Sequence, residues 1–93
     1  MVIASCELIL YLPAVSSLKE KRKIIKSLID KSRNKFNIAV AEVENNDYWQ
    51  SAVIGAAAVG NDRHYLESMM NKYINFVETL PGFILTDFEV EII

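Results

Sequence analysis

Cationic side chains gather in one stretch of this sequence, and cations repeated along a helix are suited to binding phosphate groups. Eight of the ten lysines and arginines lie between residues 19 and 35, and only two acidic residues, Glu20 and Asp30, lie among them. The stretch carries a formal charge of +6, eight minus two, whereas the other residues carry −8, two minus ten. Such a separation of charge bears on the partners of a protein more than on its fold.

Five of these cations are predicted to form a continuous stripe on a helix. They span an arc of roughly 100° beside the apolar side of that helix, over a length of roughly 20 Å. This spacing matches the backbone phosphates of a nucleic acid. The candidate RNA- or anion-binding residues are therefore Lys19, Arg22, Lys23, Lys26 and Arg33. The alternative is a solvated helix face with a few ion pairs between neighbouring turns.

Acidic side chains are expected on one face of a sheet. Alternation along the strands places four carboxylates there, and two more are expected to join them from a neighbouring strand. The four are Glu7, Asp87, Glu89 and Glu91, and the two are Glu42 and Glu44. No spacing of a divalent-metal site is present among them, so no metal is expected. An acidic face also argues against RNA binding by stacking of bases on the sheet, which uses aromatic residues.

The residues that could act in catalysis do not form a known arrangement. Cys6, the single cysteine, lies on an apolar strand, which favours a buried hydrophobic role over a reactive thiol. His64, the single histidine, falls in the first turn of a predicted helix with no nucleophile implied beside it. The segment 12–17 has no glycine and so lacks the cradle of a phosphate-binding loop. We expect no catalytic residues, no cofactor and no enzymatic activity.

Two aromatic residues follow a turn signal in the middle of the chain. Asn45, Asn46 and Asp47 predict a tight connection, and Tyr48 and Trp49 come directly after it. Aromatic side chains at such a position either anchor an interaction with a partner or cap the hydrophobic core at the end of a hairpin.

The periodicity of apolar residues predicts four strands and two helices. Strand patterns cover residues 1–12, 36–44, 50–60 and 83–93, and helical patterns cover 17–34 and 61–80. The first helix begins with a capping box formed by Ser17 and Glu20. Asn34 is expected to end this helix in the left-handed conformation, and Pro81 with Gly82 ends the second helix.

Three side-chain positions follow from these elements. The last strand is expected to direct Ile84, Phe88, Val90 and Ile92 to the same side. The open sheet face is expected to carry an apolar patch of Ile3, Ile9, Tyr11, Phe83 and Leu85. Lys21 falls inside the apolar arc of the first helix, so its ammonium group must either reach solvent or pair with a carboxylate such as Glu20 or a sheet-edge acid.

The element order predicts the fold class. Strand–helix–strand twice over gives a ferredoxin-like α+β sandwich, with a four-stranded antiparallel sheet and two helices on one face, as a single domain over residues 1–93. No apolar run approaches the roughly 20 residues of a membrane-spanning helix. Glu7 and Pro13 interrupt the N-terminal apolar stretch, so no secretory signal is expected. We therefore expect a cytoplasmic protein without membrane contact.

Short motifs spread along the chain resemble the YlxP-like family of small bacterial proteins. They are Ser17 to Arg22 (SLKEKR), Asn34 to Asn37 (NKFN), Ala41 to Val43 (AEV), Asp47, and Trp49 with Gln50. The resemblance runs from the first strand to the end of the second helix. It implies a ferredoxin-like fold and carries over no catalytic residue or cofactor. Members of this family are often encoded beside translation and ribosome-maturation factors, which implies an RNA- or ribosome-linked role by association.

The cationic stripe gives the first functional hypothesis, a non-enzymatic protein that docks structured RNA or a ribosomal particle through its first helix. Contacts with phosphates would depend on shape and charge, with little reading of bases. The alternative is a homo-oligomeric or protein–protein interaction module, in which a sheet edge, the open face or the aromatic residues Tyr48 and Trp49 meet a second chain. A possible homodimer belongs to this second hypothesis.

Overall fold

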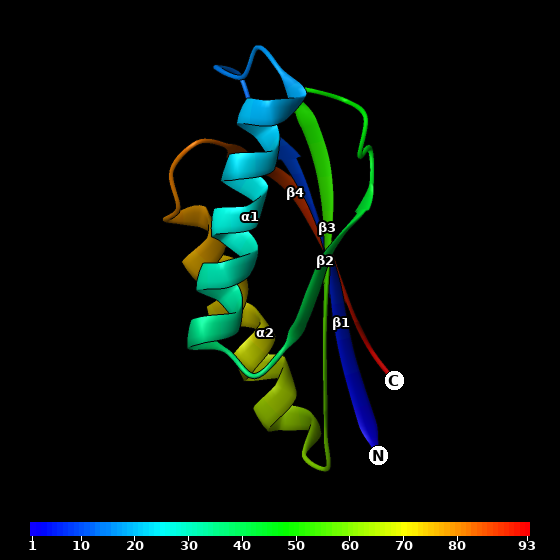
Figure 1. Ribbon diagram of the computed structural model, residues 1–93. Helices are drawn as coiled ribbons and strands as arrows, with labels where there is room; N and C mark the ends of the chain where they lie inside the picture. The colour runs from blue at the N-terminus through cyan, green and yellow to red at the C-terminus, as the bar shows by residue number, and fades with distance from the viewer.

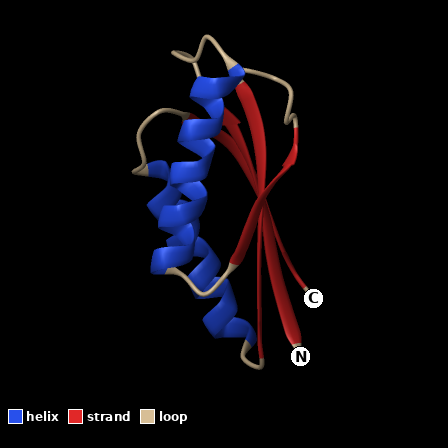
Figure 2. Ribbon diagram, in the orientation of Figure 1, coloured by secondary structure: helices blue, strands red, loops and turns tan.

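A computed structural model describes all 93 residues and confirms the predicted fold class (Figure 1). The elements are β1 (Val2–Tyr11), α1 (Leu18–Lys35), β2 (Ala39–Glu44), β3 (Ser51–Gly60), α2 (Arg63–Glu78) and β4 (Ile84–Ile92). The sheet has the order β2-β3-β1-β4 with every neighbouring pair antiparallel. Both helices lie on one face of the sheet, which leaves the other face open (Figure 2). The chain is therefore a two-layer, ferredoxin-like α+β fold.

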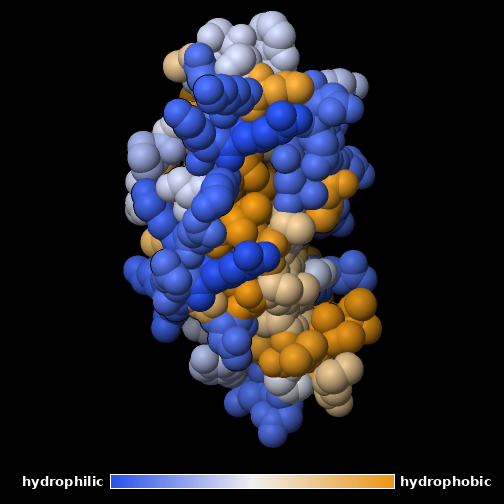
Figure 3. Space-filling view, in the orientation of Figure 1, coloured by the Kyte–Doolittle hydropathy of each residue, from blue (hydrophilic) through white to orange (hydrophobic).

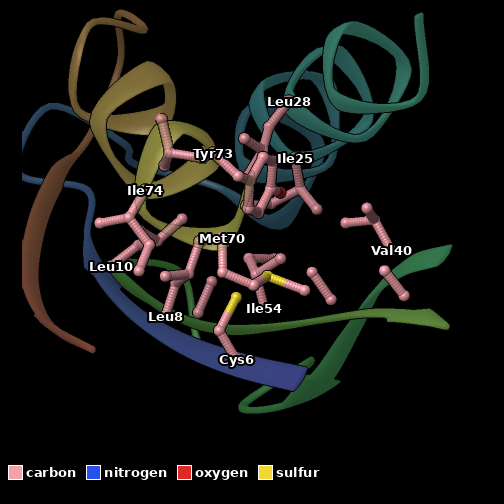
Figure 4. Close-up of a cluster of buried hydrophobic side chains, with 14 of the residues drawn as sticks. Cys6, Leu8, Leu10, Ile25, Leu28, Val40, Ile54, Met70, Tyr73 and Ile74 are labelled. Atoms are coloured by element: carbon pink, nitrogen blue, oxygen red, sulfur yellow. The ribbon is translucent and has the colours of Figure 1, made fainter. Parts of the chain in front are cut away.

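The core fills the space between the helices and the two central strands (Figure 4). Every second residue of β1 points into it, which confirms the predicted alternation, and Leu8 and Leu10 are almost completely buried. From β3 the core receives Ile54 and three alanines, Ala52, Ala56 and Ala58. Because alanine side chains are short, α2 can approach β3 closely, and Met70 lies beside Ile54 (Figure 4).

The two ends of α1 differ in how well the sequence predicted them. Half of the predicted capping box is present, since the Ser17 hydroxyl accepts a hydrogen bond from the backbone of Glu20 at 3.2 Å, but Glu20 does not return a bond to the Ser17 backbone. The Glu20 carboxylate reaches back to Ser16, whose backbone and hydroxyl both donate to it. The expectation that Asn34 ends the helix in the left-handed conformation is wrong. The helix continues through Lys35, and Phe36 ends it with extended backbone.

Polar and aromatic contacts join the two helices inside the core. The hydroxyls of Ser32 in α1 and Tyr73 in α2 lie 2.9 Å apart, and the Ser32 hydroxyl also donates to the Leu28 carbonyl. Phe36 packs edge-on against Tyr73, with ring centroids 5.3 Å apart. These contacts satisfy both buried hydroxyls and fix the place at which the chain leaves α1 for β2.

One residue inserted in β4 makes part of the predicted side-chain pattern wrong. Ile9 pairs with Asp87 and Leu10 with Leu85, so Thr86 is an extra residue that forms a β-bulge. Because of this extra residue, the β4 residues that precede the bulge point to the opposite faces of the sheet from those predicted. Leu85 therefore packs toward the core, whereas Ile84, expected on that side, lies exposed on the open face. Phe83 also packs against the core, so Phe83 and Leu85 do not belong to an open apolar patch.

Backbone groups of both edge strands are hydrogen-bonded to side chains, from the two helices and from β4 itself. Arg33 donates to the Val40 carbonyl of β2 at 3.2 Å, and Arg63 donates to the Ile92 carbonyl of β4 at 3.4 Å. The Asp87 carboxylate accepts the backbone N–H of Phe88 at 2.8 Å. Together with bulges in β2 and β4, these contacts weaken both edges as templates for another strand.

Alkaline pH is expected to destabilise the fold. Burial raises the pKa of the Cys6 thiol to about 11, opposed by its hydrogen bond with the backbone of Ala56, and raises the pKa of Tyr73 to about 12, opposed by the hydrogen bond with Ser32. In the unfolded chain these groups ionise at about 8.5 and 10. Between the unfolded-state and folded-state pKa of each group, the unfolded chain binds fewer protons than the folded one. The free energy of unfolding therefore falls as pH rises through this range.

Urea unfolding measured from about pH 8 to about pH 11 checks this, with a midpoint that decreases above about pH 9. Tyr73→Phe and Cys6→Ala should each lower the free energy of unfolding at neutral pH. Each should also make that free energy fall less steeply as pH rises. A midpoint that stays constant over this range would contradict the assignment.

Candidate functional site

The five candidate cations lie where the sequence placed them, on the exposed side of α1. Lys19, Arg22, Lys23, Lys26 and Arg33 are all exposed. The molecule contains two ion pairs, Lys21 with Glu42 and Lys26 with Asp30, and the second is solvent-exposed at 3.3 Å. Lys19, Arg22 and Lys23 have neither an ion pair nor a hydrogen bond from their side chains. Most of the positive charge of α1 is therefore unneutralised within the chain.

Four of these five cations border grooves on the two sides of α1. Arg22, Lys26 and Arg33 line a groove of about 430 Å³ between α1 and β2, whose walls include Ile25 and Ile29. Figure 3 shows this strip of hydrophobic atoms between α1 and β2, crossed by strongly hydrophilic side chains.

A second groove lies on the other side of α1. Lys23 lines this groove together with Lys31, against residues 80–83 that follow α2. The two grooves make α1 a ridge with cations along both flanks.

A buried lysine fixes this helix to the sheet. Lys21 is 1% exposed, and its Nζ lies 2.8 Å from Oε2 of Glu42, a side chain that is 14% exposed. Lys21 is the only polar partner of this buried Oε2 atom. Glu42 was expected on the open face, and this expectation is wrong, because Glu42 pairs with Ile54 in the sheet and shares its side, toward the helices. The open question about Lys21 is thereby settled in favour of an acid on a sheet edge.

The same lysine holds the loop between β2 and β3. Lys21 Nζ donates to the Asn45 carbonyl at 2.6 Å, and Asn45 is the single non-glycine residue with a positive φ, 62°. The Asn45 amide donates to the Ser51 hydroxyl at 3.0 Å, across the base of the loop. Sequence reasoning missed this clamp, although a lysine inside an apolar arc and an asparagine in a turn signal were both visible.

The loop presents its two aromatic side chains to solvent. Tyr48 is 62% exposed and Trp49 is 53% exposed. Trp49 therefore does not cap the core at the end of the hairpin, and that alternative is wrong. Gln50 donates to the carbonyls of Pro13 and Val15, and its own carbonyl accepts from the Leu12 backbone at 2.9 Å. The aromatic pair thus stands on a loop that is tied both to α1 and to the segment before it.

The open sheet face is acidic, as predicted, and is hollow beside its carboxylates. Glu7 lies directly opposite Glu89, and Glu91 lies opposite Ser5, in the pairing of β1 with β4. None of these carboxylates has a cationic partner, and like charges in facing positions are unfavourable. A hollow of about 540 Å³ extends from them over small residues, and Arg33 borders it. The small residues are Ser5, Ala39, Ala41, Gly55 and Ala57.

Other chemistry-bearing residues stay apart. Cys6 is buried within the core, and His64 is exposed at the start of α2 without a hydrogen bond from its ring. No three histidine, cysteine or acidic side chains approach one another closely enough to hold a metal ion. No helix is sufficiently long and apolar to cross a membrane.

Comparison with known sequences identifies the family. Residues 3–90 match the family described as "Protein of unknown function (DUF503)". This chain belongs to the DUF503 family. The chain is also 36% identical, over 78 residues, to a protein of Bacillus subtilis (strain 168) described as "Uncharacterized protein YlxP". That match covers 84% of this chain and 83% of the relative, and it confirms the YlxP-like resemblance.

Comparison with solved structures supports the fold of this DUF503 chain. The "De novo designed protein Foldit4" superposes with a TM-score of 0.58 and 12% sequence identity, covering 100% of this chain and 97% of the designed one. At that identity the similarity concerns the arrangement of strands and helices alone.

Breaking the buried ion pair of the DUF503 chain should cost more than removing it entirely. Lys21→Met leaves the Glu42 carboxylate buried without its cation, and we expect a loss of about 3 kcal/mol in the free energy of unfolding. In Lys21→Met/Glu42→Leu no buried charge remains, so most of that loss should be recovered. Urea unfolding measures both. Lys19→Met, a change at an exposed neighbour, is the control and should alter stability by less than about 0.5 kcal/mol. Equal losses in the single and double variants would contradict this assignment.

Proposed function

We propose that this DUF503 protein is a non-enzymatic binding protein that docks structured RNA, free or within a ribosomal particle, through α1. The observation that carries the proposal is the unneutralised charge of the helix. Of the eight cations between residues 19 and 35, Lys21 and Lys26 have carboxylate partners, which leaves six without one. A solvated helix face stabilised by its own ion pairs would show more of them.

The shape of the site supports phosphate contacts. The exposed side of α1 stands as a ridge between two grooves, with Arg22, Lys26 and Arg33 on one flank and Lys23 and Lys31 on the other. Arginine and lysine donate charge-assisted hydrogen bonds to phosphate oxygens. Cations on both flanks can reach phosphates that lie on either side of the helix, so binding follows the shape of the RNA more than its base sequence.

The acidic open face also supports the binding of RNA on the α1 side of the molecule. Its unpaired carboxylates would repel a polyanion, and the cations of α1 lie in the opposite layer of the sandwich. The field of the molecule would therefore steer RNA toward α1. The association by family with translation and ribosome-maturation genes agrees with an RNA ligand.

Charge reversal on α1 tests the proposal. Arg22→Glu/Lys26→Glu should weaken binding of a fluorescein-labelled RNA stem-loop at least tenfold, measured by anisotropy at low salt, because phosphates would meet carboxylates. The matched control is Arg63→Glu/Lys72→Glu, which reverses two exposed cations of α2. This control should bind like the wild type, and circular dichroism should show both variants folded.

Salt dependence gives an independent measure of the number of phosphate contacts. About five contacts predict that log K falls with log salt concentration with a slope of magnitude about 3–5. Absence of binding by the wild type at low salt would overturn the proposal, and so would equal affinities of the two charge-reversed proteins.

Self-association is the second candidate function, and the unpaired carboxylates of the open face favour it. Because side chains bind backbone groups at both sheet edges, edge-to-edge pairing is disfavoured, and the contact that the charges favour joins the basic ridge of one copy to the acidic face of another. Such an interface should dissociate as salt rises. Light scattering at increasing protein concentration in low salt would show a growing mass. A constant monomer mass would exclude self-association.

A further inference from the structure

We propose that the loop between β2 and β3 is a base-binding site, in which Tyr48 and Trp49 stack on unpaired bases of an RNA whose backbone lies on the first turns of α1. This inference rests on the proposed function of α1 in RNA binding. It adds the class of RNA, one that offers unpaired bases, and residues outside the cationic helix.

The first observation is the state of the two aromatic side chains. Both are more than half exposed, and neither side chain makes a hydrogen bond. The aromatic ring pairs of the molecule involve Phe36, Tyr73 and Phe76, and its cation–π contact joins Lys35 to Phe76. The rings of Tyr48 and Trp49 are thus not stacked on another aromatic ring or on a cation of their own chain. Exposed tyrosine and tryptophan side chains with free faces are suited to stacking on a ligand.

The second observation is that the loop is held in place before any ligand arrives. The Asn45 carbonyl accepts from Lys21 at 2.6 Å and also from the Tyr48 backbone at 3.0 Å. Gln50 binds the segment before α1 through the Pro13 carbonyl. Burying the charge of Lys21 is costly unless it is paired. Here the pair with Glu42 and the bond to Asn45 fix the loop, so less conformational entropy is lost on binding.

The third observation is the place of the loop. Lys21, its anchor, lies between the exposed cations Lys19 and Arg22 in the first turns of α1. Figure 1 shows the loop at the same end of the molecule as the start of α1. An RNA whose phosphates contact these cations would therefore bring its neighbouring nucleotides close to the aromatic pair.

The combination of rings and cations selects the ligand class. Phosphate contacts alone do not use aromatic side chains, and a closed A-form duplex keeps its bases stacked inside. Single-stranded tails, loops and bulges offer bases whose faces can be covered by aromatic rings. A protein partner also uses exposed tyrosine and tryptophan, but the cluster of unpaired cations beside the loop favours a polyanion.

Trp49 is the single tryptophan of the chain, so its own fluorescence reports on the site. Two probes are compared at low salt, a blunt RNA duplex and the same duplex extended by an unpaired tail. The tailed RNA should bind more tightly and quench Trp49 emission, whereas the blunt duplex should leave the emission nearly unchanged.

Trp49→Ala and Tyr48→Ala should each weaken binding of the tailed RNA about tenfold with little effect on the duplex. Tyr65→Ala, at an aromatic residue 65% exposed on α2, is the matched control and should change neither affinity.

The outcomes separate this inference from the proposed function. Anisotropy that shows salt-dependent binding of both RNAs, with equal affinities and unchanged Trp49 emission, would overturn base stacking and leave the role of α1 intact. Equal weakening of both RNAs by Trp49→Ala would also overturn it, since the loop would then act without reading unpaired bases. Binding of neither RNA would overturn the proposed function and this inference together.

Discussion

A lysine buried among apolar side chains must find an anion, and this constraint organises the part of the molecule that faces partners. Lys21 belongs to the side of α1 that packs on the sheet, yet its ammonium group reaches the Glu42 carboxylate on β2 and the Asn45 carbonyl beyond it. One side chain thereby connects the helix, an edge strand and the following loop. A hydrophobic residue at this position would pack equally well, but it would specify neither the pairing of α1 with β2 nor the course of the loop.

The position of this anchor explains why the two kinds of surface residue occur together. The cations of α1 and the aromatic residues of the loop come from separate parts of the chain. The hydrogen bond from Lys21 to the Asn45 carbonyl holds the loop beside the helix. The open sheet face has the opposite character, with unpaired carboxylates facing one another across β1 and β4. Sequence segments of opposite charge are thus sorted into the two layers of the sandwich, because one amphipathic helix carries nearly all the cations.

Most of the fold could be predicted from the sequence, because apolar periodicity and capping residues are local signals. The alternation in β1, the cap at Ser17 and the end of α2 ahead of Pro81, at Glu78, each required only a few neighbouring residues. The errors arose where one inserted residue or a distant contact decides the outcome. The bulge at Thr86 exchanged the faces of Ile84 and Leu85, and α1 continued through Asn34 because Phe36 packs on α2.

The candidate site was predicted in part, for the same reason. Helical geometry alone placed the exposed cations, whereas the grooves that they border depend on what packs against each flank of α1. The partner of Lys21 depends on which way Glu42 points in β2, and no local pattern shows this. Exposure of Trp49 likewise depends on hydrogen bonds made by residues 45 and 50 to distant segments.

The β-bulge in β2 limits which sequences can adopt this fold. Between Glu42 and Glu44 the pairing with β3 slips, and the Val43 side chain comes to lie over Gly55. A methyl group at position 55 would sit 2.9 Å from Cγ1 of Val43, closer than two carbon atoms tolerate. Positions 43 and 55 are therefore coupled, because a residue larger than glycine at 55 requires the Val43 side chain to move aside or to be replaced by a smaller one.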